Sequence, residues 1–214
     1  MPPLQSRLSP ISIPYKQCSL FAIDCSQITE SEFNESYHML DARERDRLSK
    51  FLRLDSKQRF AICRALMKQI LSPYVQIKPS NISFEYTAEL KPFLKNSPIY
   101  FNLSHSHELA IVGISAYQIG VDIEKIDPFR NIEGLINEIF TQSEKEWIYK
   151  ENTVKRFYKL WTMKEAHYKC TENRSTYSYF SSVFFNKRGF PYFPDCQTFS
   201  IHYKKYMISI CFKN

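Results

Sequence analysis

The chain has 214 residues, 43% of them hydrophobic, which is enough for one large domain or two smaller lobes with a buried core. Its formal net charge of +7 at pH 7 favours acidic partners such as nucleic acid, an anionic membrane or an acidic ligand, without choosing among them. Only four glycines are present, which excludes the glycine-rich phosphate loops of Rossmann and P-loop proteins, so a bound phosphate would need side chains or helix ends.

The first half of the chain predicts helices set between strands. Residues 1–17 contain several prolines and are predicted to form an extended arm. Thr29 and Glu32 have the spacing of a capping box, which predicts the start of a helix. The other elements predicted in this half are a strand at 19–24, helices at 41–54 and from 55 to just before Pro73, and strands at 82–86, 99–103 and 109–115.

The second half repeats this inventory. Its predicted elements are a strand at 119–125, helices at 131–140, 143–150 and 153–172, and strands at 179–185, 198–203 and 206–212. Each half therefore holds helices and about three strands, which predicts an α+β protein of two similar α/β lobes joined near residues 116–118. We expect an N-terminal lobe at 18–117 and a C-terminal lobe at 118–214.

The cysteines show no metal-binding spacing. Six are present, without a CxxC pair or a Cys/His set spaced for zinc, and we expect reduced thiols that serve as small apolar residues. A disulfide framework remains formally open because six is an even number. No stretch approaches about 18 consecutive apolar residues, and the start of the chain lacks the apolar run of a signal peptide, so we expect a cytoplasmic protein without a membrane span.

Two acidic residues lie on the strand predicted at 119–125. Asp122 and Glu124 are two residues apart, so their carboxylates share one face of the strand. Two acids on one face repel each other unless a cation lies between them, and Mg²⁺ prefers such oxygen ligands. A solvated strand face with ordinary acids is the alternative, and these two residues alone favour it.

The long helix predicted at 153–172 carries a further acid and two lysines. Trp161, Glu165 and Lys169 are spaced four residues apart and lie along one stripe of the helix. One interpretation is a surface salt bridge beside a core tryptophan, worth only a few tenths of a kcal/mol. The functional interpretation places Glu165 at the metal, with Lys169 and Lys164 near phosphate oxygens.

Polar residues at 102–107 follow the strand predicted at 99–103. Ser104 and His105 could bind a phosphate or cap a turn. His105 and His107 form a His-x-His pair, but no other Cys or His lies near them in sequence, which disfavours a transition-metal site. Ser104 also lacks the flanking glycines of a hydrolase nucleophile elbow.

Three sequence blocks, 101–106, 119–124 and 157–169, together resemble the 4′-phosphopantetheinyl transferases. The resemblance is to the larger, monomeric, two-lobed class that activates peptide synthetase and acyl carrier domains, of which the surfactin-synthetase-activating type is an example. It implies two lobes related by a pseudo-twofold axis, each a small, mainly antiparallel sheet packed with helices. The active site is expected in the cleft between them.

The resemblance also implies roles for individual residues. Asp122, Glu124 and Glu165 match the family's metal-binding acids, and Glu165 also matches the proposed base for the incoming serine hydroxyl. Lys169 matches a catalytic lysine that contacts the coenzyme A diphosphate, with Lys164 beside it. The other positions implied to lie at coenzyme A are Arg47, Arg59, Lys91, Ser104 and His105, with Glu144 as a further acid near the site.

The chain departs from the family pattern at two positions. Leu90 precedes Lys91 and Pro92 where the family usually has glycine, and Phe60 follows Arg59 where a small hydroxyl residue is common. Both departures concern the affinity for coenzyme A and leave the metal acids intact.

The function implied is the Mg²⁺-dependent transfer of 4′-phosphopantetheine from coenzyme A to a serine of an acyl or peptidyl carrier protein. Mn²⁺ is an alternative ion, and the identity of the carrier stays open. The expected partners are coenzyme A and an acidic carrier protein, and neither nucleic acid nor a membrane is expected as a partner. We expect a monomer on which Phe129, Ile132 and Phe140 could form the apolar surface that receives the carrier. A weakly catalytic protein of this fold that only binds coenzyme A or carriers is the first alternative, and a basic nucleic-acid-binding protein is the second.

Overall fold

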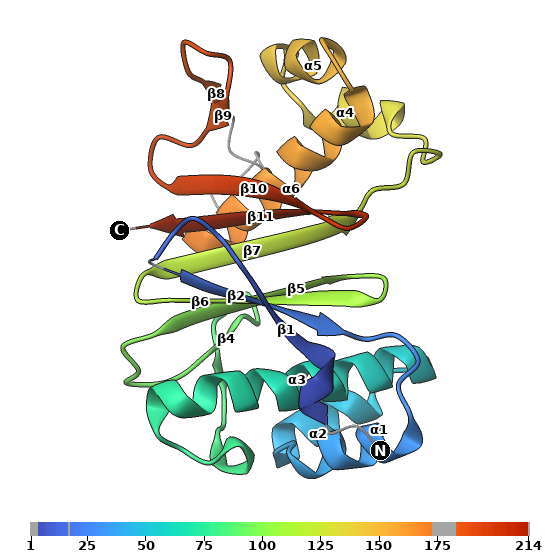
Figure 1. Ribbon diagram of the computed structural model, residues 1–214, viewed down its shortest axis with the longest axis vertical. Helices are drawn as coiled ribbons and strands as arrows, with labels where there is room; N and C mark the ends of the chain where they lie inside the picture. Colours follow the sequence, from blue (N-terminus) through green and yellow to red (C-terminus); the bar gives the residue numbers. More distant parts are fainter. Residues whose placement is uncertain (1–3, 17, 173–182, 214) are drawn as a thin grey trace.

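The computed structural model describes residues 4–16, 18–172 and 183–213. Its helices and sheets form four layers, with helices at both ends and two sheets in the middle (Figure 1). The helices are α1 (Glu30–His38), α2 (Ala42–Ser49), α3 (Leu54–Val75), α4 (Glu133–Ile139), α5 (Gln142–Tyr149) and α6 (Thr153–Thr171), and 3-10 turns lie at Leu4–Arg7 and Pro79–Asn81. The strands are β1 (Leu8–Ile11), β2 (Cys18–Asp24), β3 (Glu85–Tyr86), β4 (Pro92–Phe93), β5 (Tyr100–Ser106), β6 (Leu109–Ser115), β7 (Gln118–Lys125), β8 (Phe184–Phe185), β9 (Pro191–Tyr192), β10 (Gln197–Tyr203) and β11 (Tyr206–Lys213).

Apart from the edge strand β1, which only the first sheet contains, the two main sheets share one topology, with β2 and β7 as the first strands of the two halves. The first has the antiparallel order β1-β2-β6-β5, and the second has the antiparallel order β10-β11-β7. In each half a first strand is followed by three helices, a two-stranded ribbon and a final hairpin, and the first strand pairs with the last. The α+β class and the two similar lobes predicted from the sequence are confirmed.

Three apolar layers separate these elements. The first lies between α3 and the first sheet, with Ile62, Leu66 and Val112 in its centre. The second lies between the two sheets and contains Ile111 and Ile208. The third packs α4, α5 and α6 against the second sheet. Successive residues of a strand point to opposite faces of its sheet, and each of these sheets has a neighbouring layer on both faces. Apolar residues on both faces of each sheet therefore become buried.

Buried capping boxes begin three helices. Thr29, Asp41 and Thr141 cap α1, α2 and α5, each with a glutamate three residues later. Each of these glutamates is buried and meets a cation: Arg7 Nη2 lies 2.8 Å from Glu32, Lys68 Nζ lies 2.6 Å from Glu44, and Lys164 Nζ lies 2.8 Å from Glu144. The last two pairs occupy matching places in the two halves, between a short helix and the long helix that follows it.

Several predicted elements differ from the structure. Residues 102–106 belong to strand β5 rather than to a turn after it, because Phe101 to Ser106 pair with β6. Pro73 lies inside α3, two residues before its last residue Val75, so the helix continues past the proline that was expected to follow it. Of the strand predicted at 82–86 only β3 forms, and the part at 179–182 of the strand predicted at 179–185 lies outside the described residues.

The first residues are also more ordered than an extended arm requires. Leu4 is fully buried in the first core, and β1 pairs with β2 as the edge of the first sheet. Within the described part of the chain, no helix has the length and apolar character needed to cross a membrane.

Candidate active site

The edge strands β5 and β7 bring the two halves together. The side chains of Asn102 and Ser106 point toward β7, where Asn102 Oδ1 accepts a hydrogen bond from Val121 N (2.8 Å) and Ser106 Oγ accepts one from Lys125 N (3.1 Å). Residues two apart on a strand share a face, so Ser104 points the same way. The seam is therefore held by side chains bonded to backbone rather than by a strand ladder.

Asp122 of β7 lies at the centre of this seam. Its carboxylate is buried, and its Oδ1 accepts hydrogen bonds from Lys169 Nζ (2.6 Å) and Ser104 Oγ (2.8 Å). Its other oxygen, Oδ2, is buried without a hydrogen-bond partner. A buried carboxylate oxygen without a partner is costly, and it is the kind of atom that a metal ion would satisfy.

Glu124 and Glu165 flank Asp122. Burial raises the pKa of Glu124, the Asp122 carboxylate raises it further, and a hydrogen bond from Ser106 Oγ (2.8 Å) offsets part of that effect. Burial likewise raises the pKa of Glu165, which the charges of Asp122 and Glu124 also raise and the Lys169 ammonium lowers. The three acids thus form one mutually repelling group that a divalent cation would stabilise.

The carboxylates are not yet gathered around one point. Their oxygens do not all lie within 4.8 Å of one another, and the Lys169 ammonium lies 2.6 Å from Asp122 Oδ1. The donor set fits Mg²⁺ in kind, since it offers carboxylate oxygens, one of them without a partner.

Gly120 explains why α6 lies so close to β7. A Cβ at this position would lie 2.0 Å from the backbone oxygen of Ala166 and 2.4 Å from the backbone nitrogen of Cys170. Only glycine therefore allows the helix that carries Glu165 and Lys169 to approach the strand that carries Asp122.

A pocket of about 460 Å³ opens beside this acidic group. It lies between the halves, with walls from α2, α3, residues 89–92, β5 and the end of α6. Five residues predicted to bind the cofactor line it, namely Arg47, Arg59, Lys91, His105 and Lys169. Arg64 also lines it, and the acids Glu89 and Glu172 only partly offset this positive charge, so the pocket favours an anionic ligand.

The pocket has an apolar side as well. Phe51, Phe60, Pro92 and Leu103 line it, and the guanidinium groups of Arg47 and Arg64 lie 5.5 Å and 5.4 Å from the centre of the Phe60 ring. Apolar walls next to cations suit a ligand that joins a flat ring to phosphate groups.

His105 faces this pocket from β5. Loss of solvent around the imidazole lowers the pKa of His105, and the nearby cations Arg59 and Lys169 lower it further. The ring is therefore neutral at pH 7 without a ligand, and an anion bound among these cations would favour its protonated form.

Lys91 ties the two halves together. Its Nζ donates hydrogen bonds to the backbone oxygens of Lys169 (2.6 Å) and Ile119 (3.3 Å) and lies 3.0 Å from Glu172. A cation at the carboxyl end of a helix satisfies carbonyl groups that lack a helical partner. Lys91 thus lines the pocket while its ammonium binds the end of α6.

Two family models match this chain. Residues 118–211 match the 4′-phosphopantetheinyl transferase superfamily, and residues 27–117 match its N-terminal part, described as "4′-phosphopantetheinyl transferase, N-terminal". The chain belongs to the 4′-phosphopantetheinyl transferase superfamily. The boundary between the two matches falls at residues 117–118, just before β7.

Named members of the superfamily are about a quarter to a third identical to this chain over the aligned residues. The 4′-phosphopantetheinyl transferase HetI of Nostoc sp. is 32% identical over 150 residues, which cover 66% of this chain and 63% of HetI. The transferase ffp of Bacillus subtilis is 27% identical over 66% of this chain and 64% of its own length, and Sfp of Bacillus subtilis strain 168 is 26% identical over 70% and 68%. The chain thus spans less than two thirds of HetI and of ffp.

Some positions that the superfamily resemblance implied are not at the acidic group. The side chain of Lys164 is 2% exposed, pairs with Glu144, lies 5.5 Å from the centre of the Phe140 ring and does not line the pocket, and its contact with coenzyme A stays a prediction. Glu144 is also fully buried, where it holds the start of α5. Both residues support the fold of this superfamily member behind the site.

The expected carrier seat is also only partly available. Ile132 and Phe140 are buried in the third core, so they cannot receive a partner, whereas Phe129 is 94% exposed. Ser104 is buried and bonded to Asp122, and its expected contact with a phosphate stays a prediction.

Two pocket residues were not anticipated from the sequence. Arg64 is buried on α3, and burial lowers its pKa while Tyr86 and Glu44 raise it. Tyr168 lines the pocket from α6. Both residues lie in helices whose apolar residues recur at helical spacing, and that pattern predicts that these positions belong to the core. The only available signal for Arg64 was a charged residue inside a run of buried positions.

Proposed function

We propose that this chain transfers the 4′-phosphopantetheine group of coenzyme A to a serine of an acyl or peptidyl carrier protein and releases 3′,5′-ADP. The observation that carries this proposal is a cationic pocket lined by Lys169, whose ammonium bonds the buried carboxylate of Asp122, an acid with one buried oxygen that lacks a partner. Family membership and the names of the relatives support it.

Coenzyme A would lie in the pocket between lobes 18–117 and 118–214. Arg47, Arg59 and His105 would contact its 3′-phosphate, and the apolar wall around Phe60 would receive the adenine ring. The diphosphate would then reach Lys169, whose ammonium can leave Asp122 for a phosphate oxygen. This exchange would free Asp122 for a metal ion.

Asp122, Glu124 and Glu165 would hold Mg²⁺, with Mn²⁺ as the alternative ion. When bound, the ion neutralises charge on the diphosphate and on the leaving group. The protein's own part is positioning: Ser104 and Ser106 fix Asp122 and Glu124 by hydrogen bonds of 2.8 Å, and the α6–β7 contact fixes Glu165.

Glu165 is the proposed base for the carrier serine. Its pKa is raised by burial, which brings it closer to neutral pH and makes the carboxylate a better proton acceptor. The serine oxygen would bond to the β-phosphorus, the bond from that phosphorus to the 3′,5′-ADP oxygen would break, and the serine proton would pass to Glu165. Lys169 would stabilise the charge that develops on the phosphate oxygens.

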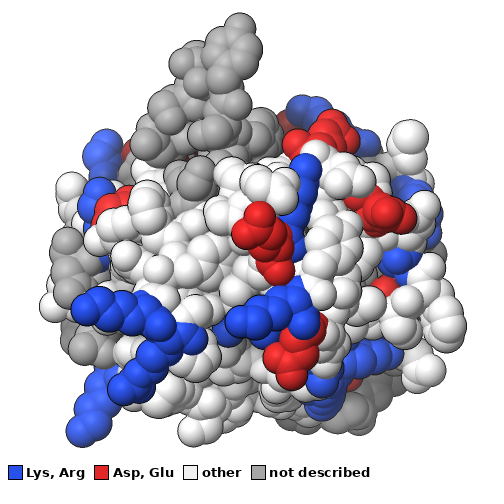
Figure 2. Space-filling model, turned by 90° about the horizontal axis from the view of Figure 1, so that it is seen from above, with Lys and Arg blue, Asp and Glu red and all other residues white. Residues whose placement is uncertain are grey.

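The proposal also covers the oligomeric state, the location and the partners of the protein. We propose a cytoplasmic monomer whose basic charge attracts coenzyme A and acidic carriers. Figure 2 shows Lys and Arg side chains interspersed with Asp and Glu side chains over the described part of one face. That face lacks, in its described part, the continuous basic stripe expected for a nucleic-acid-binding protein.

Intact-mass analysis of apo-carrier proteins tests the proposal. Carriers of fatty acid, polyketide and peptide synthetase type would be incubated with the protein, coenzyme A and Mg²⁺, and one of them should gain the mass of one phosphopantetheine group. Omission of Mg²⁺ or the Glu165→Gln variant should abolish the gain. Tight coenzyme A binding with no mass gain on any carrier would contradict the transferase and favour a binding protein of the same fold.

A further inference from the structure

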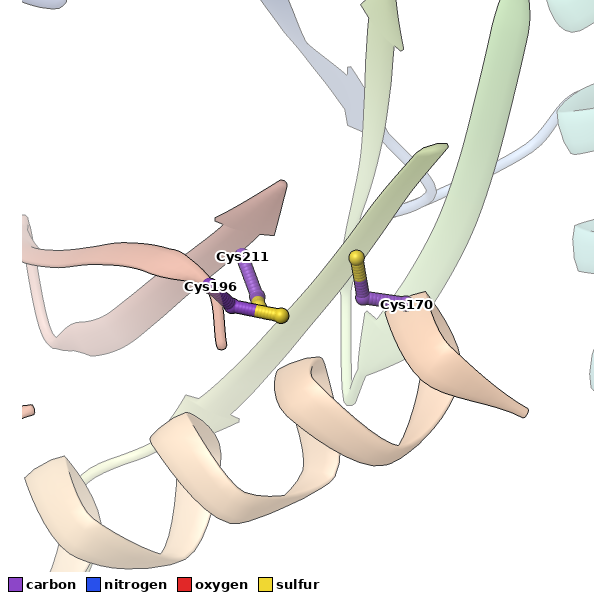
Figure 3. A group of neighbouring side chains, drawn as sticks. All are labelled: Cys170, Cys196 and Cys211. Carbon is purple, nitrogen blue, oxygen red and sulfur yellow. The ribbon is translucent and has the colours of Figure 1, made fainter. Parts of the chain in front are cut away.

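Three cysteines that are far apart in sequence meet at one point in the C-terminal half (Figure 3). Cys170 comes from α6, Cys211 from β11, and Cys196 from the segment just before β10. Their sulfur atoms all lie within 4.8 Å of one another, and none of the three forms a disulfide. Cys170 and Cys211 are buried, and Cys196 is partly exposed.

A histidine and an aspartate adjoin this cluster. His167 lies three residues before Cys170, on the same side of α6, and its side chain is buried. Ligand atoms of His167, Asp195 and Cys196 also lie within 4.8 Å of one another. His167 Nε2 lies 3.0 Å from Asp195 Oδ1, and the imidazole stacks on Phe193 with ring centres 3.9 Å apart.

This group is chemically separate from the proposed active site. Its members meet β11 and residues 193–196, and Cys170 Sγ also donates a hydrogen bond to the backbone oxygen of Gln118 at the start of β7 (3.3 Å). None of them lines the pocket, whereas Lys169 of the same helix lines it and bonds Asp122. Simple apolar packing explains one buried cysteine, but it does not explain why three thiols meet at one point while a buried histidine and an aspartate adjoin one of them, Cys196.

We propose that Cys170, Cys196, Cys211 and His167 bind one zinc ion. Thiolate sulfur and imidazole nitrogen are the ligands that Zn²⁺ prefers, and a set of three cysteines and one histidine is a common structural zinc site. Asp195 would then hold the His167 ring in place, because a carboxylate that accepts a hydrogen bond from a ligating imidazole fixes the orientation of that ring.

The ligand spacing explains why the sequence does not reveal this site. The His167 and Cys170 pair lies on one helical turn, but Cys196 and Cys211 follow 26 and 41 residues after Cys170 (196 − 170 and 211 − 170), without a CxxC knuckle. The antiparallel pairing of β10 with β11 and the packing of α6 on that sheet bring them together.

The ion would fasten the last turns of α6 to β11 and to residues 193–196. Those turns also carry Lys169, and Glu165 lies one turn earlier. The site has protein ligands at all four positions, as structural zinc sites do, so its effect would be on stability and helix position rather than on chemistry.

Metal analysis of the full chain, produced without a histidine tag and passed through metal-free buffer, tests this proposal. We expect about one zinc per chain by inductively coupled plasma mass spectrometry. X-ray absorption should give Zn–S distances of about 2.3 Å, and cobalt-substituted protein should show the visible bands of tetrahedral thiolate coordination. These measurements on the unaltered protein do not depend on a variant that folds.

Variants separate this site from the acidic group. Cys196→Ala, at the least buried of the three cysteines, should lose the zinc, whereas Cys18→Ala, at a buried cysteine of β2 outside the cluster, and Glu165→Gln should keep it. A strong chelator should lower the Tm of the wild type by about 5 °C or more and leave the Tm of Cys196→Ala nearly unchanged.

Two results would overturn the proposal. One is protein that contains no zinc and takes up no cobalt after reduction, which would leave the three cysteines as apolar core. The other is mass analysis of alkylated protein showing a disulfide among these cysteines in freshly prepared material. Neither result bears on phosphopantetheine transfer, which the carrier assay measures independently.

Discussion

At the residue scale, the candidate site consists of charged side chains whose burial costs free energy. Three acids lie near one another beside the Lys169 ammonium, and Asp122 keeps a buried oxygen without a partner. Alternation along one strand predicted that Asp122 and Glu124 share a face, whereas their proposed role as metal ligands came from the family resemblance. The burial of Lys164 could not be predicted, because it depends on Glu144, which lies twenty residues earlier in sequence (164 − 144) and meets it only after α5 packs on α6.

Replacing the proposed base should separate activity from stability. Glu165→Gln is expected to lower transfer at least about 100-fold, since general base catalysis typically contributes that much or more. Its metal-free Tm should equal or exceed that of the wild type, because burial disfavours the ionised carboxylate that the change removes. Mass-based carrier assays and calorimetry measure the two effects.

Glu138→Gln serves as the control, because Glu138 is an exposed acid on α4. It should change neither property. Near-normal transfer by Glu165→Gln would remove Glu165 from the proposed role.

Leu90 stands before Lys91 and Pro92 where the family usually has glycine, and its backbone conformation costs free energy for a leucine. Its backbone φ is +62°, in the left-handed region, and its side chain is largely exposed. A non-glycine residue there costs about 1–2 kcal/mol. Leu90→Gly is therefore expected to raise the free energy of unfolding by about 0.5–1 kcal/mol after the added freedom of the unfolded chain is counted.

Urea denaturation measures this difference. Leu52→Gly is the matched control, because Leu52 is fully exposed in a loop and has no positive φ, and it should lower stability instead. Equal effects of the two changes would show that the φ of Leu90 carries no strain.

At the element scale, the long helices and the central strands could be predicted closely. The predictions of 153–172 for α6 and 119–125 for β7 agree with Thr153–Thr171 and Gln118–Lys125, because both have strong hydrophobic periodicity and clear ends. The extent of β5 was missed, because its polar residues Asn102, Ser104 and Ser106 are typical of a turn and their partners on β7 are not visible in sequence.

The contact between α6 and β7 predicts a sharp difference between two glycines. Gly120→Ala would place a Cβ 2.0 Å from the backbone of α6, so it should destabilise the fold by about 3 kcal/mol and lower transfer by moving Glu165 and Lys169. Gly134→Ala, in α4 with no atom within 4 Å of the new Cβ, should instead stabilise by roughly 0.5 kcal/mol. Thermal unfolding of the two variants measures both, and a stable, active Gly120→Ala would contradict the described packing.

The first residues are fastened to α1 by a pair that responds to pH. Hydrogen bonding from Arg7 lowers the pKa of Glu32 from 4.5 to about 2. The ionised carboxylate therefore stabilises the fold fully above pH 4.5, and this contribution is lost as the pH falls toward 2.

Glu32→Gln should consequently lower the free energy of unfolding by about 3 kcal/mol at pH 7, and the deficit should shrink as the pH falls below 4.5. Denaturant titrations at several pH values measure this, with Glu35→Gln as the control, because Glu35 is an exposed acid on the same helix. A deficit that stayed constant down to pH 2 would contradict the assigned cause.

At the scale of the whole molecule, both halves contribute charged residues to one pocket. The N-terminal half supplies Arg47, Arg59 and His105, and the C-terminal half supplies Lys169, which connects the pocket to the Asp122 carboxylate. The sequence predicted two lobes because each half has a similar list of elements. It could not predict the seam between β5 and β7, which depends on three-dimensional packing.

This arrangement predicts a salt-dependent affinity for the proposed ligand. The Kd of 3′,5′-ADP, measured by calorimetry, should rise roughly threefold to tenfold between low and high ionic strength as the pocket cations are screened. Arg47→Gln should weaken binding and reduce this dependence, whereas Lys187→Gln, an equal change of charge at an exposed residue outside the pocket, should do neither. A Kd that is independent of salt would contradict a phosphate site formed by these cations.

The shared strand and helix order of the two halves has an evolutionary consequence. A chain that repeats one fold unit is best explained by duplication of an ancestral half, whose paired copies met across a common face. Joining the copies covalently would let each half change independently, so that the proposed acids lie in one half and most of the pocket cations in the other. In a pair of identical subunits, each subunit would have to carry both sets of residues.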